Sequence, residues 1–291
     1  GDCPTRLNRS MTTPASKPAP KKSDLPARLI SAAVLIPLLI LVGWLGGITV
    51  AVVATLASLI GLNEMLLLVR RAGWRPLRRE GIVLGALVTA AAAFDGQTTL
   101  LATAAVAGAL LIASGIIRRN ALFLGDFVFT TVPVLYVALP LASIILLRDG
   151  PAGLQWVILA FAATFALDTG AYAVGRLIGQ HKMAPSISPG KTWSGLAGAV
   201  AMAAVWGWGW AEWNSTPQPW VLCVLAGVTA VVAQGGDLSV SFVKRHFGVK
   251  DASNLIPGHG GVLDRFDGLL STAPLVALFV YVTHGGMNLW G

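Results

Sequence analysis

The chain has few charged side chains, 12% of its 291 residues, and only two cysteines. Soluble domains have about 25% charged residues, so a water-soluble fold could not cover the apolar surface of a chain that is 55% hydrophobic. Because Cys3 and Cys223 have no CxxC spacing and no other metal-ligating neighbours, we expect neither a disulfide nor a zinc site. The sequence also lacks a GxxxxGK phosphate loop and any internal repeat.

What the sequence has instead is a succession of long apolar stretches with a mean hydropathy of +0.72 over the whole chain. A helix needs about 20 mainly apolar residues to cross a bilayer. The sequence therefore predicts an all-α, polytopic integral membrane protein with about nine transmembrane helices. A count of eight or ten also agrees with the pattern, because the third stretch is short. The nine stretches are residues 29–45, 47–69, 81–94, 98–117, 122–147, 153–175, 195–212, 219–236 and 268–290.

The segment before the first stretch, residues 1–28, is polar and rich in Pro, Ser, Thr and Lys. Such a composition cannot bury enough apolar surface to offset the entropy of ordering. We therefore predict a disordered basic cytoplasmic tail, followed by one continuous membrane domain. Residues 29–147 form its N-terminal helices, and residues 148–291 form its C-terminal helices and carry the catalytic motifs.

The basic residues alternate with the apolar stretches. If all nine stretches are spans, twenty of the 21 Lys and Arg residues fall on one side of the membrane, and only Arg148 falls on the other. Because Lys and Arg collect on the cytoplasmic side, we expect a cytoplasmic N-terminus and an external C-terminus, in a bacterial-type inner membrane. Topology and lipid headgroups then explain the net charge of +8, and we expect no nucleic-acid partner.

The longest polar interruption within the apolar sequence runs from Asp237 to Asp267 and holds four acids, four bases and two histidines. If the helix of the eighth span continues, helical spacing gives one of its faces four polar residues: Asp237, Ser241, Lys244 and Arg245. Asp264 and Asp267 are three residues apart and would likewise share a face at the entrance to the ninth span.

Carboxylates beside several bases favour a magnesium–nucleotide site, because hard oxygen ligands hold Mg²⁺ while Lys and Arg neutralise phosphate charge. The glycine-rich turn at residues 257–261 would let the backbone pass close to phosphate oxygens. The competing interpretation is a solvated loop whose charges pair with one another and with lipid headgroups. The position of His246 beside a basic pair indicates an interfacial role. For His259, a ligand contact and a hydrogen bond that structures the loop are equally compatible with the sequence.

A second polar feature lies near the end of the sixth stretch. Asp168 stands within an apolar helix, where an ionisable side chain is costly unless it faces a cavity or a partner. Tyr172, Gly175 and Gly179 recur on the same helix face, which favours a ligand cleft or a close helix contact. Glu64, in the second stretch, matches no motif, and we expect it to be buried or interfacial and paired with a nearby arginine.

Residues from Ser241 to Asp267 resemble the signature of phosphatidate cytidylyltransferases, also called CDP-diacylglycerol synthases. The shared elements are Ser-Phe-Val-Lys-Arg, then Lys-Asp, then Pro-Gly-His-Gly-Gly-Val-Leu-Asp-Arg-Phe-Asp. A second block is similar to another region of the family: Asp-Thr-Gly-Ala-Tyr from Asp168, and Ile-Ser-Pro-Gly-Lys-Thr from Ile187. Ser194 stands where the family pattern has a glutamate, so we assign no acidic role there.

The resemblance implies that the phosphate of phosphatidate attacks the α-phosphorus of CTP, that pyrophosphate leaves, and that CDP-diacylglycerol stays in the membrane. It implies CTP and phosphatidate as substrates, Mg²⁺ as the cofactor with room for a second cation, and a homodimer. The implied catalytic residues are Asp237, Asp264, Asp267, Lys250 and Lys244, and the three aspartates are also the implied metal ligands. The implied substrate-binding residues are Lys191, Ser188, Asp168, Ser241, Arg245, Asp251, His259 and Arg265.

Other functions remain open at this point. CMP transfer to a different lipid phosphate, or a CTP-dependent lipid kinase, would need the same kinds of residue. A secondary transporter would explain the spans and the intramembrane acid, but it predicts inverted repeats, and the sequence shows none. The DGxxAR motif of CDP-alcohol phosphatidyltransferases is absent from the chain.

Overall fold

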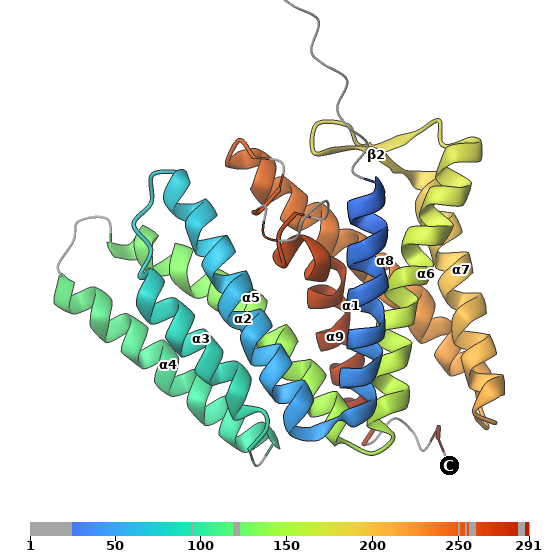
Figure 1. Ribbon diagram of the computed structural model, residues 1–291, viewed down its shortest axis with the longest axis horizontal. Coiled ribbons are helices and arrows are strands. Elements are labelled where there is room, and N and C mark those ends of the chain that lie inside the picture. Colours follow the sequence, from blue (N-terminus) through green and yellow to red (C-terminus); the bar gives the residue numbers. More distant parts are fainter. Residues whose placement is uncertain are drawn as a thin grey trace, which may run out of the picture.

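The computed structural model describes residues 25–94, 96–118, 123–249, 251–253, 255, 260–284 and 289–290. In these residues it consists of nine helices and one two-stranded antiparallel sheet (Figure 1). The helices are α1 (Leu25–Leu45), α2 (Gly47–Arg71), α3 (Arg78–Ala91), α4 (Gly96–Arg118), α5 (Phe123–Asp149), α6 (Gly153–Ile178), α7 (Trp193–Trp213), α8 (Pro219–His246) and α9 (Leu263–Val282). The strands β1 (Lys182–Ala184) and β2 (Ser188–Thr192) form a hairpin between α6 and α7.

Each helix corresponds to one predicted apolar stretch, which confirms the helical class and the membrane character. The count of about nine spans is not confirmed, because only five helices in the described part of the chain are long and apolar enough to cross a membrane: α2, α5, α6, α8 and α9. The 14 residues of α3, for example, extend only about 21 Å, which is less than the thickness of a bilayer core of about 30 Å.

Helix boundaries differ from the prediction where polar residues continue a helix. The first helix begins at Leu25, inside the predicted tail of residues 1–28, of which residues 1–24 lie outside the described part. Helix α8 continues past the predicted end at residue 236 to His246, and α9 begins at Leu263 rather than at residue 268. Both extensions carry charged motif residues, which lower the hydropathy without breaking the helix.

In the described part of the chain, the basic residues other than Arg148 gather at one end of the bundle. Figure 1 shows that the start of α1, the ends of α2, α6 and α8, and the hairpin all lie at this end, whereas the C-terminus lies at the other. Arg148 lies at the opposite end, where its guanidinium donates hydrogen bonds to the carbonyl oxygens of Gly43 (2.7 Å) and Trp44 (3.1 Å). The bundle thus separates the basic residues as the charge pattern predicts.

Helix α9 lies in the middle of the bundle (Figure 1), and its residues belong to two apolar clusters. One cluster joins α2, α3 and α5 to Leu269 and Leu270 of α9. The other surrounds Trp156 of α6, joins α7 and α8, and includes Val276 of α9. Helix α9 therefore packs against both groups of helices, and this packing fixes the position of its first turns.

Candidate active site

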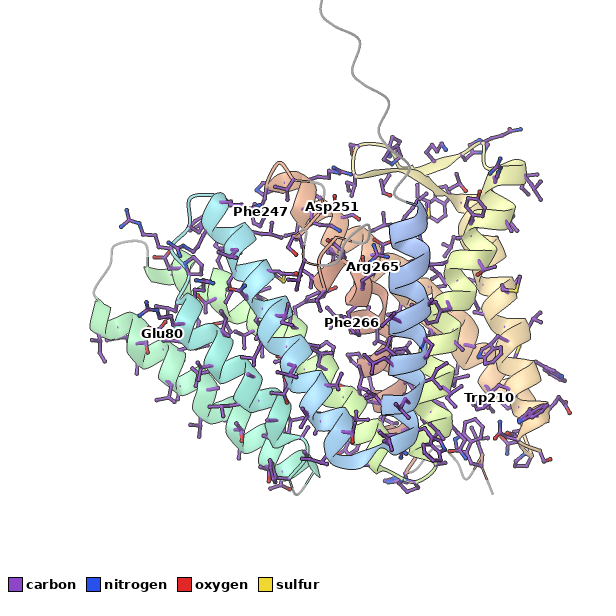
Figure 2. The ribbon with its side chains drawn as sticks, viewed as in Figure 1. Glu80, Trp210, Phe247, Asp251, Arg265 and Phe266 are labelled. Carbon is purple, nitrogen blue, oxygen red and sulfur yellow. The ribbon has the colours of Figure 1, made fainter. Side chains whose placement is uncertain are left out.

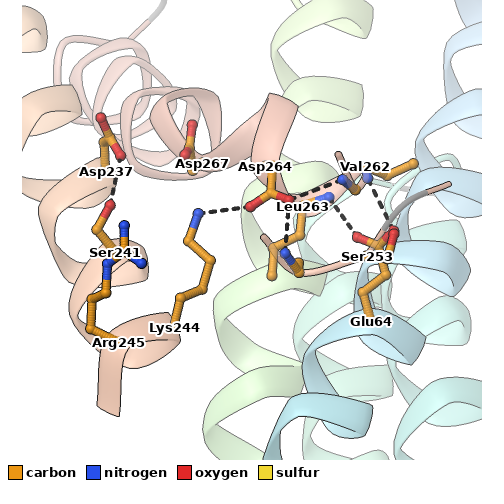
Figure 3. Close-up of polar contacts among 12 residues, drawn as sticks. Glu64, Asp237, Ser241, Lys244, Arg245, Ser253, Val262, Leu263, Asp264 and Asp267 are labelled. Atoms are coloured by element: carbon orange, nitrogen blue, oxygen red, sulfur yellow. Dashed lines mark hydrogen bonds and ion pairs between the residues drawn. The ribbon is translucent and has the colours of Figure 1, made fainter. Parts of the chain in front are cut away.

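Polar residues of the two predicted motifs meet at the basic end of the bundle, and Figure 3 shows those of α8 and α9. The last turns of α8 carry Asp237, Ser241, Lys244 and Arg245, so the predicted helical continuation is confirmed. The first turns of α9 carry Asp264, Arg265 and Asp267, and strand β2 carries Ser188 and Lys191. Figure 2 shows Arg265 in the same half of the bundle as Asp251 and Phe266.

Lys244 and Asp264 form a buried ion pair between α8 and α9. The distance from Lys244 Nζ to Asp264 Oδ1 is 2.7 Å, and the two side chains are 10% and 5% exposed. Asp264 Oδ2 also accepts hydrogen bonds from the backbone N–H groups of Ala252 (2.8 Å) and Gly261 (2.9 Å). Because a buried carboxylate is tolerated only when paired and hydrogen-bonded, Asp264 joins the end of α8 to the segments on both sides of residues 254–259.

Asp237 joins α8 to the hairpin. Its Oδ2 atom forms an ion pair with Lys191 Nζ, and its Oδ1 atom accepts a hydrogen bond from the Ser241 hydroxyl at 3.3 Å. A second link comes from Arg245, whose Nε donates to the carbonyl oxygen of Ile187 at 3.3 Å. These contacts bring the block around Lys191 against the motif on α8, as the resemblance implies.

Asp267 and Asp168 complete an electrostatic cluster with Asp237. Asp267 interacts electrostatically with Asp237, Lys244 and Arg265, and Asp168 interacts with Asp237, Lys191 and Arg265. Asp267 Oδ1 accepts a hydrogen bond from the N–H of Gly268 in its own helix at 2.8 Å. The site therefore places carboxylates from α6, α8 and α9 near several basic side chains, an arrangement that suits cations and anionic ligands together.

The donor set suits a magnesium ion only in combination with a substrate. In the described residues, no group of three acids or other metal-ligating side chains lies close enough to form a metal site. Mg²⁺ is commonly bound by one or two carboxylates plus substrate phosphates and water. Asp237 and Asp267 could supply the carboxylates, whereas both oxygens of Asp264 already accept hydrogen bonds from protein groups.

The remaining predicted site residues are distributed around this cluster. Ser188 is half-buried at the start of β2, and Asp251 and Arg265 are exposed. Lys250 and His259 lie outside the described residues. Ser194, at the position that departs from the family pattern, donates a hydrogen bond to the carbonyl oxygen of Ile178 at 3.3 Å.

Glu64 of α2 is a residue that the motifs did not predict as part of the site. It is buried, and its hydrogen-bond partners in the described part of the chain are Ser253, Val262 and Leu263 rather than the expected arginine. Its Oε1 atom accepts hydrogen bonds from the Ser253 hydroxyl (2.6 Å) and the Val262 N–H (3.1 Å), and its Oε2 atom accepts one from the Leu263 N–H (2.8 Å). The signal in the sequence was that Glu64 is the only acidic residue of α2, which is otherwise mainly apolar.

An apolar cavity of about 460 Å³ extends from Phe266 of α9 toward the end of the bundle where Arg148 lies. Its walls come from α1, α2, α5 and α6, and they include Trp44, Phe161 and Phe165. Phe266, which stands between Arg265 and Asp267 in the sequence, also lines it. The same turn of α9 therefore borders an apolar space and a charged cluster.

Comparison with known proteins agrees with this geometry. Residues 26–283 match the model of the cytidylyltransferase family. The chain is 35% identical over 270 residues to the phosphatidate cytidylyltransferase of Brucella suis biovar 1 (strain 1330), covering 88% of this chain and 93% of the relative. It is 30% identical over 257 residues to the phosphatidate cytidylyltransferase of Staphylococcus haemolyticus (strain JCSC1435), covering 87% and 96%. With the phosphatidate cytidylyltransferase of Bacillus subtilis (strain 168), the identity is 35% over 176 residues, covering 58% of this chain and 65% of the relative.

Proposed function

The chain belongs to the cytidylyltransferase family, and we propose that it transfers CMP from CTP to phosphatidate, giving CDP-diacylglycerol and pyrophosphate. Relatives named phosphatidate cytidylyltransferase that align over most of both chains support this substrate pair. The observation that carries the proposal is the meeting of Asp237, Asp267, Lys191 and Lys244 at one end of the bundle.

The reaction exchanges one phosphoanhydride bond for another. An oxygen of the phosphatidate phosphate forms a bond to the α-phosphorus of CTP, while the bond from that phosphorus to the oxygen bridging the β-phosphorus breaks. The attacking oxygen is already anionic, so neither a covalent enzyme intermediate nor a general base is required. The protein's contribution is to position two anions against each other and to neutralise the charge of the leaving pyrophosphate.

The basic side chains provide this neutralisation. Lys191 and Lys244 lie inside the cluster, and the more exposed Arg245 and Arg265 lie at its border. We assign Lys191 and Lys244 to the triphosphate and the two arginines to either phosphate group. Asp168, Ser188, Ser241 and Asp251 would orient these groups, and Lys250 and His259 are further predicted contacts.

We assign Asp237 and Asp267 to hold Mg²⁺. When bound, the ion would offset negative charge on the triphosphate oxygens. Asp264 remains a predicted ligand as well, although it would first have to exchange protein hydrogen bonds for the metal. A second cation, bound around Asp237 and Asp264, belongs to the same proposal.

The apolar cavity supports a lipid as the acceptor. With the phosphate at the polar cluster, acyl chains could extend past Phe266 into the space between α1, α2 and α6. An apolar space that reaches the same turn of α9 as Arg265 and Asp267 suits an acceptor that carries acyl chains.

The proposed location is a bacterial inner membrane with the site on the cytoplasmic side, where CTP is available. The collection of basic residues at the site's end of the bundle supports this orientation. Association into a homodimer through small-residue helix faces belongs to the same proposal.

The test is an assay of the purified protein in detergent with phosphatidate, Mg²⁺ and CTP labelled at either the α- or the γ-phosphate. We expect the α-label in the lipid phase and the γ-label in pyrophosphate in the aqueous phase. Entry of the γ-label into lipid would indicate a CTP-dependent lipid kinase. Transfer of the α-label only to another lipid phosphate would change the acceptor, and no turnover by the folded protein would favour transport.

A further inference from the structure

We propose that Glu64 is a positioning residue: from α2, its carboxylate fixes the start of α9 and the segment around Ser253 in the arrangement that forms the site. The importance of this arrangement for catalysis rests on the proposed function, whereas the structural restraint itself does not. Glu64 lies far from the motif in sequence and on a different helix, so this role is visible only in the folded chain (Figure 3).

The start of α9 has unsatisfied donors that Glu64 satisfies. The first N–H groups of a helix have no partner within the helix, and the N-cap residue, Val262, provides no side-chain cap. Glu64 accepts hydrogen bonds from the N–H groups of Val262 and Leu263 at 3.1 and 2.8 Å. A negative charge at a helix N-terminus also interacts favourably with the helix dipole. Glu64 therefore acts as the cap of α9 from a neighbouring helix.

A glycine makes this close approach possible. A Cβ atom built at Gly261 would lie 2.6 Å from Glu64 Oε2 and 2.9 Å from Oε1, distances that real Cβ contacts do not adopt. Any larger residue at this position would push the carboxylate away from the start of α9. The chain thus brings its backbone directly against Glu64 immediately before the helix begins.

Glu64 and Asp264 hold neighbouring donors of the same segment. Asp264 accepts from the N–H groups of Ala252 and Gly261, while Glu64 accepts from Ser253 and from the next two N–H groups after Gly261. A displacement of this backbone away from Glu64 would therefore also displace the donors of Asp264. Since Asp264 pairs with Lys244, the effect would reach the basic groups of the site.

The role is one of positioning because Glu64 has no access to a substrate. Glu64 is only 4% exposed, and both of its carboxylate oxygens accept hydrogen bonds from protein groups. Any effect of its replacement on catalysis must pass through the segment that it holds.

The principal test is the isosteric substitution Glu64→Gln, which keeps one acceptor oxygen but replaces the other with an NH₂ group. This NH₂ group would face either the Leu263 N–H or the Ser253 hydroxyl and the Val262 N–H. We expect kcat to fall by about tenfold, because a buried backbone donor loses its acceptor. Hydrogen–deuterium exchange should rise in peptides covering residues 251–253 and 260–265. The matched control is Asn63→Ala, which removes the neighbouring contact of α2 to Arg78 without touching α9. It should leave exchange in those peptides unchanged.

A second variant separates positioning from general stability. Ser253→Ala removes one of the three hydrogen bonds to Glu64 and should give a smaller fall in kcat. The double variant Glu64→Gln/Ser253→Ala should lose less than the product of the two single effects, because both act through the same contact. This non-additivity is not expected if each substitution only lowers stability.

Two results would overturn the inference. One is a kcat within twofold of wild type together with unchanged exchange in the Glu64→Gln protein. The other is a loss of kcat that merely follows a lowered melting temperature, equally in Glu64→Gln and Asn63→Ala. If the wild-type protein transfers no CMP, the proposed function fails on its own, and the exchange comparison still decides whether Glu64 holds the segment.

Discussion

Lys244 and Asp264 show how a single pair of side chains can serve both stability and chemistry. Each is almost fully buried, and each has a charge that would be costly without the other. The pair joins the end of α8 to the start of α9, and the same lysine interacts with Asp267. A change at either partner should therefore alter the stability of the helix junction as well as the site.

Replacing Lys244 alone should be strongly destabilising. In Lys244→Met, the buried Asp264 carboxylate loses its cationic partner, at a cost of about 3 kcal/mol. In the double variant Lys244→Met/Asp264→Asn, the neutral amide can still accept hydrogen bonds from Ala252 and Gly261, so we expect most of the stability to return. Thermal unfolding in detergent would measure both effects. CMP transfer should be lost in both variants, and an active double variant would contradict the role of the pair.

The residues of the site could be predicted from the sequence to the extent that they form local patterns. The spacing of Asp237, Lys244 and Arg245 predicts their common helix face, and the structure confirms the helix. Glu64 could not be assigned in this way, because its partners lie about 190 residues further along the chain and nothing near it repeats. Likewise, only the folded chain distinguishes Asp264, which accepts hydrogen bonds from two backbone N–H groups, from Asp267, which interacts with Asp237.

At the scale of elements, the site depends on how closely α8 and α9 approach. Gly236, next to Asp237, lies against Ser271 of α9, and a Cβ atom at residue 236 would lie 1.9 Å from Ser271 Oγ. Its neighbour Gly235 has no atom within 4 Å of such a Cβ. The two glycines therefore have different roles although they are adjacent in the sequence.

This difference gives a matched pair of substitutions. Gly236→Ala should force α8 and α9 apart and move Asp237 away from Asp267, lowering stability by about 1–3 kcal/mol and reducing CMP transfer. Gly235→Ala should retain the stability and the CMP transfer of wild type. The double variant Gly236→Ala/Ser271→Gly should recover activity, because the space for the new methyl group is restored. Equal activity of the two single alanine variants would show that this contact does not set the distance between the carboxylates.

Hydropathy predicted which stretches become helices, since each long apolar run forms one in the structure. It could not predict the ends of α8 and α9, because their charged turns are stabilised by contacts between helices. It also missed the hairpin of β1 and β2, whose short polar strands have no hydrophobic alternation. The hairpin is held by Lys191 with Asp237 and by Ile187 with Arg245, contacts that exist only after the bundle forms.

For the whole molecule, the separation of basic residues between the two ends predicts the orientation in the membrane. In a protein without native cysteines, we expect Ser186→Cys in the exposed turn of the hairpin to be labelled from the cytoplasmic side. Asp149→Cys, exposed at the opposite end beside Arg148, should be labelled from outside. Impermeant thiol reagents applied to intact cells and to inverted vesicles would measure both. Labelling of Ser186→Cys in intact cells would reverse the orientation and separate the site from cytosolic CTP.

The central claim is that the cluster where α8 meets α9 and the hairpin transfers CMP to phosphatidate. Asp237→Asn tests it most directly, because this carboxylate contacts the hairpin and interacts with both other acids of the cluster. Asp149→Asn, the same chemical change at the opposite end of the bundle, is the control. We predict that α-labelled CTP transfers label to lipid with wild type and Asp149→Asn, and about a hundredfold more slowly with folded Asp237→Asn. Transfer by Asp237→Asn at the wild-type rate would contradict the assignment of this cluster as the active site.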